Sequence, residues 1–294
     1  KKVTTEDGKT TVQIELDYPA KTQGPVIEEM VRAKLVEAGI PADVKISQNI
    51  IAHEVQRGVK VFDSVRNIIA VSSGKGGVGK STVSANLALA LQQEGAKVGL
   101  LDADVYGPSQ PTMLGITDRP YSVDGKTLEP MIAHGLQVAS VGVLIDPDQP
   151  MIWRGPLAVS ALQQLLKQTN WKDLDYLIVD MPPGTGDIQL SLSQEVPLTG
   201  AVVVTTPQDI ALMDARKGLV MFEKVNVPIL GIIENMATHI CSKCGHEEHI
   251  FGEGGAAKMA EQYGVELLGE LPLDINIRLS MDKGEPIVIS EPDS

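Results

Sequence analysis

The amino-acid sequence predicts a three-layer α/β fold in which helices cover both faces of a mostly parallel sheet. From Asn67 onward, short apolar segments alternate with segments whose apolar residues recur at helical spacing. The apolar runs are rich in Val, Ile and Leu, as strands buried on both faces are. Hydrophobic residues make up 43% of the 294 residues and aromatic residues only 3%, so the core must be built mainly from aliphatic side chains.

The alternation assigns each predicted element in order along the chain. Strands are predicted at 67–73, 97–103, 136–142, 176–181, 200–205, 228–234 and 266–270. Helices are predicted at 81–94, 156–168, 209–224 and 254–263. Residues 105–135 are rich in proline and glycine, and we expect them to form an irregular loop region.

A small N-terminal α/β unit is expected ahead of this sheet. Residues 10–20 alternate like a half-buried strand, 25–39 have the spacing of a helix that ends at a glycine, and 43–46 could form a second strand. A plain helical leader is the alternative. The predicted division is 1–60 for this unit and its linker, and 61–294 for the main domain.

Composition narrows the classes of function. The net charge of −13 argues against nonspecific binding to nucleic acid or to anionic lipid. No apolar run approaches the roughly 18 residues that a membrane span needs. Two cysteines in a chain of this length do not make a disulfide framework, so we expect a cytosolic protein.

A complete phosphate-loop motif lies between the strand at 67–73 and the helix that follows it. The motif G-x-x-x-x-G-K-[ST] is matched at every specified position by Gly74, Lys75, Gly76, Gly77, Val78, Gly79, Lys80 and Ser81, and Thr82 follows. Glycines let backbone N–H groups turn inward as an anion nest, and the helix adds its positive N-terminal end. Lys80 is therefore predicted to contact the β- and γ-phosphates of a nucleotide and Ser81 to hold Mg²⁺. The alternative is a glycine-rich turn without a ligand.

Carboxylates end two strands that we expect to be neighbours. Asp102 and Asp104 follow the strand at 97–103, and Asp180 ends an apolar strand in the Walker B arrangement, in which the carboxylate holds Mg²⁺ through water. The glycine-rich segment 181–187 comes next and is a candidate switch, with Gly184 predicted to contact the γ-phosphate. The alternative is that these aspartates merely cap turns.

The second lysine of the loop indicates one particular group of phosphate-loop proteins. With Lys75 next to the first glycine, the motif resembles that of the deviant phosphate-loop ATPases, which include MinD, ParA and the nitrogenase iron protein. The resemblance implies a homodimer in which Lys75 contacts the partner's nucleotide. It also implies that Asp104 positions the attacking water and that Asp102 supports Mg²⁺ or the loop geometry.

The same resemblance implies which nucleotide base is bound. It implies that Asn235 reads adenine and that the region of Pro272 packs nearby. The guanine-reading pattern N-K-x-D is absent from the chain, so ATP is favoured over GTP.

Both cysteines, Cys241 and Cys244, lie together in a polar segment. C-x₂-C spacing lets two thiolates bind one metal centre, but two ligands are half of what Zn²⁺ or a [4Fe–4S] cluster requires. The implied dimer would supply the other half by symmetry. The alternatives are a zinc site within one chain, completed by His246 and His249, and a plain pair of surface thiols.

Taken in order, the motifs resemble those of the Mrp/ApbC family of ATP-binding iron–sulfur cluster carriers. They are GKGGVGKST, LLDADVYGPSQPTMLG, MIWRGP, DYLIVDMPPGTGDIQL, VVVTTPQDIAL, GIIENM and CSKCG. The resemblance implies a homodimer that binds a [4Fe–4S] cluster through Cys241 and Cys244, transfers it to apo-proteins and hydrolyses ATP slowly. No physical role is assigned to Trp153, Arg154, Gly155 and Pro156. An ATP-gated electron-transfer protein of the nitrogenase iron protein type and a MinD- or ParA-like positioning ATPase are the alternatives.

Overall fold

The computed structural model describes residues 2–6, 9–56, 59–143 and 155–292. Its largest sheet has eight strands in the order β13-β10-β9-β4-β8-β5-β7-β6. All neighbours in this sheet are parallel except β6, which pairs antiparallel with β7 at one edge. The strands are β4 (Val65–Ser73), β5 (Val98–Asp102), β6 (Met131–Ala133), β7 (Leu136–Ser140), β8 (Leu174–Asp180), β9 (Gly200–Thr205), β10 (Ile229–Asn235) and β13 (Leu267–Leu271).

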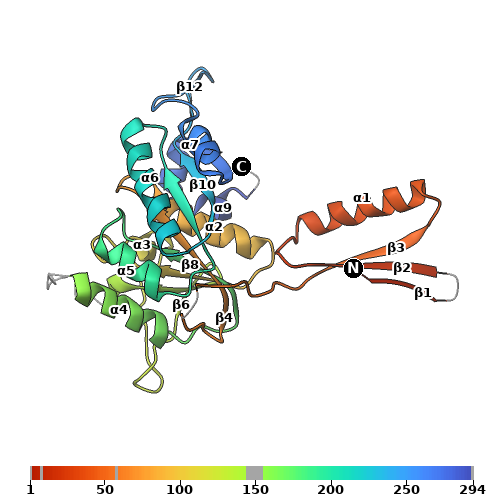
Figure 1. The fold of residues 1–294 in the computed structure, drawn as a ribbon, viewed down its shortest axis with the longest axis horizontal. Helices are drawn as coiled ribbons and strands as arrows, with labels where there is room; N and C mark the ends of the chain where they lie inside the picture. The colour runs from red at the N-terminus through yellow and green to blue at the C-terminus, as the bar shows by residue number, and fades with distance from the viewer. Residues whose placement is uncertain (1, 7–8, 57–58, 144–154, 293–294) are drawn as a thin grey trace.

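Helices cover both faces of this sheet, as predicted (Figure 1). They are α2 (Lys80–Gln93), α3 (Gln110–Met113), α4 (Gly155–Gln168), α5 (Asp187–Glu195), α6 (Asp209–Lys224), α7 (Gly255–Tyr263), α8 (Ile275–Asp282) and α9 (Ile287–Ser290), with a 3-10 turn at Val141–Val143. Successive residues of β4 show the two layers, because Ala70 belongs to one buried cluster and Val71 to the other. The first cluster includes side chains of α4, α5, α6 and α7, and the second includes side chains of α2 and α8. The predicted fold class is confirmed.

Several elements differ from the prediction. Helix α5 begins at Asp187, the last residue of the glycine-rich segment 181–187, and α8 and α9 follow Pro272 and Pro286; none of these three helices was predicted. The region 105–135 is mostly irregular, but it contains α3 and the edge strand β6. These elements are short, and packing against the sheet stabilises them. They therefore lack the long periodic pattern from which a helix or strand is predicted.

The N-terminal residues form a separate three-stranded sheet with one helix, which projects from the main body (Figure 1). Its elements are β1 (Lys2–Glu6), β2 (Lys9–Leu16), α1 (Gln23–Glu37) and β3 (Ala42–Gln48). The β-α-β part corresponds to the predicted elements, whereas β1, antiparallel to β2, was not predicted. The unit contacts the main body at the end of α2, where Lys21 N and Thr22 bond to Glu94.

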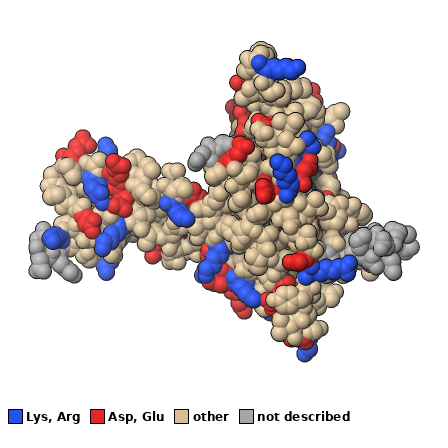
Figure 2. Space-filling model, turned by 180° about the vertical axis from the view of Figure 1, so that it is seen from behind, with Lys and Arg blue, Asp and Glu red and all other residues tan. Residues whose placement is uncertain are grey.

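The surface carries charges of both signs. Figure 2 shows basic and acidic side chains interspersed over one face, on the projecting unit as well as on the main body. Among the described residues, no helix is both long enough and apolar enough to span a bilayer.

Candidate functional site

The phosphate-loop motif forms the connection between β4 and α2, and two of its glycines are sterically required. A Cβ on Gly74 would lie 2.1 Å from the backbone carbon of Asp214. Gly79 has φ +82, and a Cβ there would lie 2.1 Å from Nδ2 of Asn235. Larger residues would push the loop off α6 and β10, so the loop depends on its glycines for its shape.

This loop encloses a cavity of about 200 Å³, which we call the loop cavity. Helix α2 begins at its floor, so the first N–H groups of the helix and their positive end face a prospective anion. The cavity is lined by Ser73, Gly76, Gly77, Gly79, Lys80, Ser81, Thr82, Asp104, Ser109, Met113 and Pro183. Its chemistry suits the phosphates of a nucleotide.

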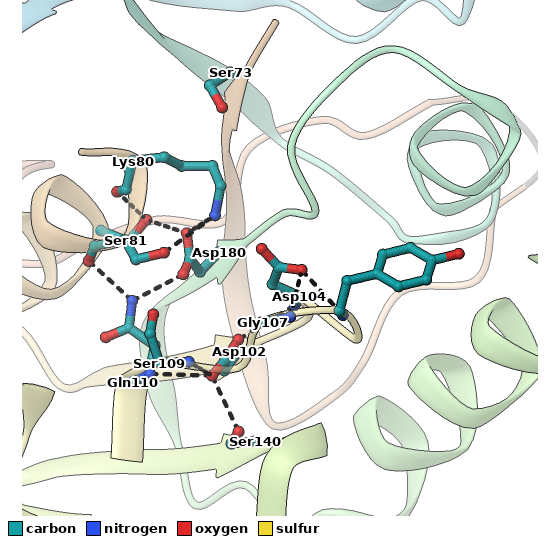
Figure 3. Close-up of polar contacts among 12 residues, drawn as sticks. Ser73, Lys80, Ser81, Asp102, Asp104, Gly107, Ser109, Gln110, Ser140 and Asp180 are labelled. Carbon is teal, nitrogen blue, oxygen red and sulfur yellow. Dashed lines mark hydrogen bonds and ion pairs between the residues drawn. The ribbon is translucent and has the colours of Figure 1, made fainter. Parts of the chain in front are cut away.

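Lys80 forms a buried ion pair at the base of the loop cavity. Its Nζ lies 2.6 Å from Oδ1 of Asp180, which also accepts a hydrogen bond from the Ser84 hydroxyl at 2.8 Å (Figure 3). The Lys80 side chain is 6% exposed and that of Asp180 is fully buried. Nζ also lies 3.3 Å from the Ser81 hydroxyl. The cation predicted for phosphate and the carboxylate predicted for metal therefore contact each other directly.

Asp102 lies beside Asp180, because the two residues are register partners across β5 and β8. This confirms the expectation that the two strands are neighbours. Asp102 is fully buried, and its Oδ2 accepts hydrogen bonds at 3.1 Å from the backbone of Ser109 and Gln110 and from the Ser140 hydroxyl. Burial, aided by the charge of Asp180, raises the pKa of Asp102 to about 7.

This raised pKa predicts how stability depends on pH. Between the ordinary value of 3.8 and about 7, folded Asp102 holds a proton that the unfolded chain has released. The free energy of unfolding should therefore fall as the pH rises through this window. We expect the thermal midpoint to fall more steeply from about pH 4 to about pH 7 in the parent than in Asp102→Asn, which has no carboxyl to titrate there. Equal slopes would show that Asp102 does not titrate in this range.

Asp104 lines the loop cavity and is held by the turn that follows β5. Its Oδ1 accepts hydrogen bonds from the backbone N–H groups of Tyr106 and Gly107, both at 3.2 Å. The side chain is 8% exposed. It is thus fixed at the cavity wall, where a carboxylate could orient a water against a terminal phosphate.

The donor set fits Mg²⁺, the ion implied by a phosphate loop with a strand-end aspartate. Carboxylate and hydroxyl oxygens are the ligands that Mg²⁺ prefers. Asp102, Asp104 and Asp180 gather beside the loop cavity, and Lys80 forms the only ion pair with any of them among the described residues. A divalent cation would offset this negative charge; the charge of Asp180 is the second cause, after burial, of the raised pKa of Asp102.

The candidate switch segment 181–187 lies against the end of β4. The Gly184 N–H, predicted to contact the γ-phosphate, donates to the Ser73 carbonyl at 2.8 Å. Pro183 is the residue of this segment that lines the loop cavity. Gly184 has φ +98, a conformation that favours glycine.

A second cavity of about 720 Å³ adjoins the first, since Gly79, Thr82 and Met113 line both. We call it the side cavity. Asn235 and Pro272, the two residues predicted near the base, also line it. Asn235 is buried and its amide donates to the Val78 carbonyl at 2.9 Å, which ties the end of β10 to the phosphate loop.

Lys75 is half-buried, and its carbonyl accepts a hydrogen bond from the Ser73 hydroxyl at 2.9 Å. Within the described part of the chain, its ammonium forms no ion pair. Of the segment without an assigned role, Trp153 and Arg154 lie outside the described residues, whereas Gly155 and Pro156 begin α4.

The two cysteines lie at the turn of a hairpin formed by β11 (His239–Ile240) and β12 (Glu247–Glu248), which projects beyond the main sheet (Figure 1). Cys241 N donates to His246 O at 2.9 Å and Gly245 N to Cys241 O at 2.8 Å. Backbone N–H groups of Lys243 and Cys244 hold the pKa of the Cys241 thiol below its usual range. Cys244 is exposed.

The described side chains that could bind a metal are not grouped around one point of this hairpin within a single chain. Among the described residues, no group of three or more His, Cys, Asp or Glu side chains is placed to hold a metal ion. The ring of His249 is turned toward the backbone, with Nδ1 3.0 Å from the Ala237 carbonyl. The geometry therefore gives no support to the alternative of a one-chain zinc site.

The root of the cysteine hairpin is hydrogen-bonded to the wall of the side cavity. Ala237 N donates to Leu271 O at 2.9 Å, and Leu273 N donates to Thr238 O at 2.7 Å. His239 Nδ1 lies 3.1 Å from Leu273 O. Residues 271–274 line the side cavity, so these hydrogen bonds connect the cysteine hairpin directly to the wall of the side cavity.

Three polar residues of the site were not predicted from the sequence. Ser84 bonds to Asp180, Ser140 bonds to Asp102, and Gln110 bonds to both Asp180 and the Ser81 carbonyl. Ser84 could have been found, because it lies one helical turn after Lys80 on α2. Ser140 belongs to a separate segment without a motif, and Gln110 lies within the motif LLDADVYGPSQPTMLG, which does not indicate its contact with Asp180.

Comparison with known proteins agrees with this geometry. The ParA-group family described as NUBPL iron-transfer P-loop NTPase matches residues 64–294. An iron–sulfur cluster carrier protein of Salmonella typhimurium is 57% identical over 289 residues, covering 97% of this chain and 78% of the relative. A protein of the same name from Escherichia coli is 62% identical over 253 residues, covering 86% of this chain and 69% of the relative.

A solved structure shares the arrangement of the main body. The nucleotide-binding protein of Archaeoglobus fulgidus in complex with ADP is 38% identical, with a TM-score of 0.69, and the match covers 79% of this chain and 90% of that one. The family match covers most of the chain and includes the phosphate loop, the strand-end aspartates and the cysteine hairpin. The chain therefore belongs to the NUBPL iron-transfer P-loop NTPase family.

Proposed function

We propose that this chain is an iron–sulfur cluster carrier that binds and slowly hydrolyses ATP and transfers a [4Fe–4S] cluster to apo-proteins. The observation that carries the proposal is the shared connection between its two sites. A hairpin with two accessible thiols is rooted on the wall of the cavity next to the phosphate loop. Relatives that match most of this chain are named iron–sulfur cluster carrier proteins, which supports an iron–sulfur cluster as the cargo.

ATP is the proposed nucleotide. Its phosphates would occupy the loop cavity, within reach of the backbone N–H groups of the glycine loop and of Lys80. Its base would enter the side cavity, whose wall contains Asn235 and Pro272. The ADP bound to the Archaeoglobus relative supports a nucleotide in this fold.

Hydrolysis would proceed by positioning and charge stabilisation. Lys80 would leave Asp180 for the β- and γ-phosphates, which frees Oδ1 of Asp180. Ser81 and Asp180 would then hold Mg²⁺, which supplies charge neutralisation to the phosphates when bound. Asp104, fixed by two backbone N–H groups, would orient the attacking water in line with the γ-phosphate.

The cluster is cargo, and we propose that two copies of the chain hold it. Cys241 and Cys244 provide two thiolates per chain, and a second copy would provide the other two across a two-fold axis. The low pKa of the Cys241 thiol favours the thiolate form that binds iron. In such a dimer Lys75, which has no partner in an ion pair among the described residues, would be available to the nucleotide of the other subunit.

The electron-transfer alternative shares the bridging cluster but lacks a specific supporting observation here. The positioning alternative would require a membrane-binding helix or a nucleic-acid-binding surface, and the net charge of −13 argues against the latter. We therefore propose a cytosolic carrier that delivers its cluster to apo-proteins.

Asp104→Asn tests the role proposed for the water-orienting carboxylate. The variant should bind ATP within about twofold of the parent, because the amide oxygen can still accept the two backbone hydrogen bonds, but its turnover should fall about 10²-fold. Single-turnover hydrolysis and equilibrium binding separate the two effects. Parental turnover would remove Asp104 from the mechanism.

The function itself is tested by anaerobic transfer. The chain, loaded with iron and sulfide, is mixed with an apo-protein that requires a [4Fe–4S] cluster, with and without ATP. We expect the acceptor to gain its activity and the visible absorption of the carrier to fall. A loaded chain that never activates the acceptor, while free iron and sulfide do, would contradict the proposal.

A further inference from the structure

Gln110 is a buried amide at the junction of three parts of the nucleotide site, and the mechanism above does not use it. It begins α3, after the turn that contains Asp104. Its side chain is fully buried, although glutamine is a residue type that usually remains exposed. A polar side chain in such a place is held there by specific contacts.

The contacts connect the strand-end aspartates to the phosphate loop (Figure 3). Gln110 Nε2 donates to Oδ2 of Asp180 and to the Ser81 carbonyl, both at 2.9 Å. The backbone N–H of Gln110 donates to Oδ2 of Asp102 at 3.1 Å. One amide group therefore bridges the two residues proposed to hold Mg²⁺.

The two oxygens of Asp180 have different partners. Oδ1 is bound by Lys80 and Ser84, whereas Oδ2 is bound by Gln110. When Lys80 moves to phosphate, Oδ1 loses its ion pair and Oδ2 keeps its hydrogen bond. Gln110 thus anchors the half of the carboxylate that does not have to change partners.

Stability alone does not account for the amide. Its Oε1 is buried and has no hydrogen-bond partner among the described residues. A buried acceptor without a partner destabilises the fold, so the amide carries a cost beside the hydrogen bond that its N–H group gives to Oδ2 of Asp180. A buried amide whose oxygen is unpaired and whose N–H group contacts two residues of a site is a candidate for a functional role.

We propose that Gln110 is a positioning residue for the metal-binding pair Ser81 and Asp180. By fixing Oδ2 of Asp180 and the Ser81 carbonyl to one planar group, it keeps the spacing of the two ligands while Lys80 moves from carboxylate to phosphate. The inference rests on the proposed ATP hydrolysis at this site.

Gln110→Met tests this role in the full chain, because methionine has a similar size and no N–H donor. A fluorescent ATP analogue is titrated in EDTA and in MgCl₂. In EDTA the affinity should stay within about twofold of the parent, whereas the tightening caused by Mg²⁺ should shrink about tenfold, the loss of one hydrogen bond to a charged group. The Mg²⁺ concentration for half-maximal hydrolysis should rise to a similar extent, and the thermal midpoint should fall somewhat, because the buried Oδ2 of Asp180 loses its donor.

Gln137→Met is the matched control. The Gln137 amide also makes two hydrogen bonds, to the backbone of Lys172, but it lies on β7 outside both cavities. The control should keep the parental response to Mg²⁺. A Gln110→Met protein with parental Mg²⁺ dependence, or one whose affinity falls equally in EDTA, would overturn the inference. A parent that shows no Mg²⁺-dependent hydrolysis would instead overturn the proposed function.

Discussion

Replacing Lys80 with alanine is expected to abolish measurable ATP hydrolysis, with turnover falling at least about 10²-fold. The ammonium would stabilise charge on the transferring phosphate in a site shielded from water, where such contacts have large effects on rate. Steady-state phosphate release by the purified variant measures the loss.

Loss of fold has to be separated from loss of chemistry in this variant. Removing Lys80 leaves the fully buried Asp180 without its cation, and an unpaired buried charge costs about 3–5 kcal/mol. Lys80→Ala with Asp180→Asn removes both charges and should restore the thermal midpoint without restoring turnover. Lys97→Ala, which breaks an exposed ion pair with Asp173, should leave both quantities near parental values. Retained hydrolysis in folded Lys80→Ala would mean that the loop cavity is not the catalytic site.

The double variant Cys241→Ser, Cys244→Ser is expected to lose the cluster completely. Serine hydroxyls do not replace the thiolates that hold a [4Fe–4S] cluster. Nucleotide binding should stay within about twofold, since neither cysteine lines the loop cavity or the side cavity. Iron content and visible absorption after anaerobic reconstitution measure the loss.

His246→Ala with His249→Ala is the control that separates cluster from zinc. It should keep full iron content if the cysteines of two chains are the only protein ligands. A large loss of metal in the histidine variant would favour the one-chain site of two cysteines and two histidines. Full iron content in the double cysteine variant would rule the hairpin out as the cluster site.

The local motifs of the nucleotide site were predictable because each carries its own chemical signature. The phosphate loop needs glycines at fixed positions, and a carboxylate at the end of an apolar strand identifies the metal side of the cavity. The adjacency of Asp102 and Asp180 followed from the expectation that their strands are neighbours, and the register confirms it.

What the sequence could not predict depends on contacts between distant segments. Gln110 contacts Asp180 70 positions further along the chain; it lies within the motif LLDADVYGPSQPTMLG, but the motif does not indicate that its amide is buried against an aspartate. The pairing of Lys80 with Asp180 was also not predicted, because the motif describes what both residues do with a nucleotide rather than with each other. The link from the side cavity to the cysteine hairpin runs through backbone hydrogen bonds, which leave no trace in side-chain patterns.

The central claim is that a cluster is completed only where two chains meet. Anaerobic reconstitution with iron and sulfide, followed by size-exclusion chromatography with light scattering and iron analysis of each peak, tests it most directly. We expect about four iron atoms per two chains, all in a dimer peak. The double cysteine variant should give no dimer peak that contains iron. A monomer peak that carries a complete cluster would contradict the account.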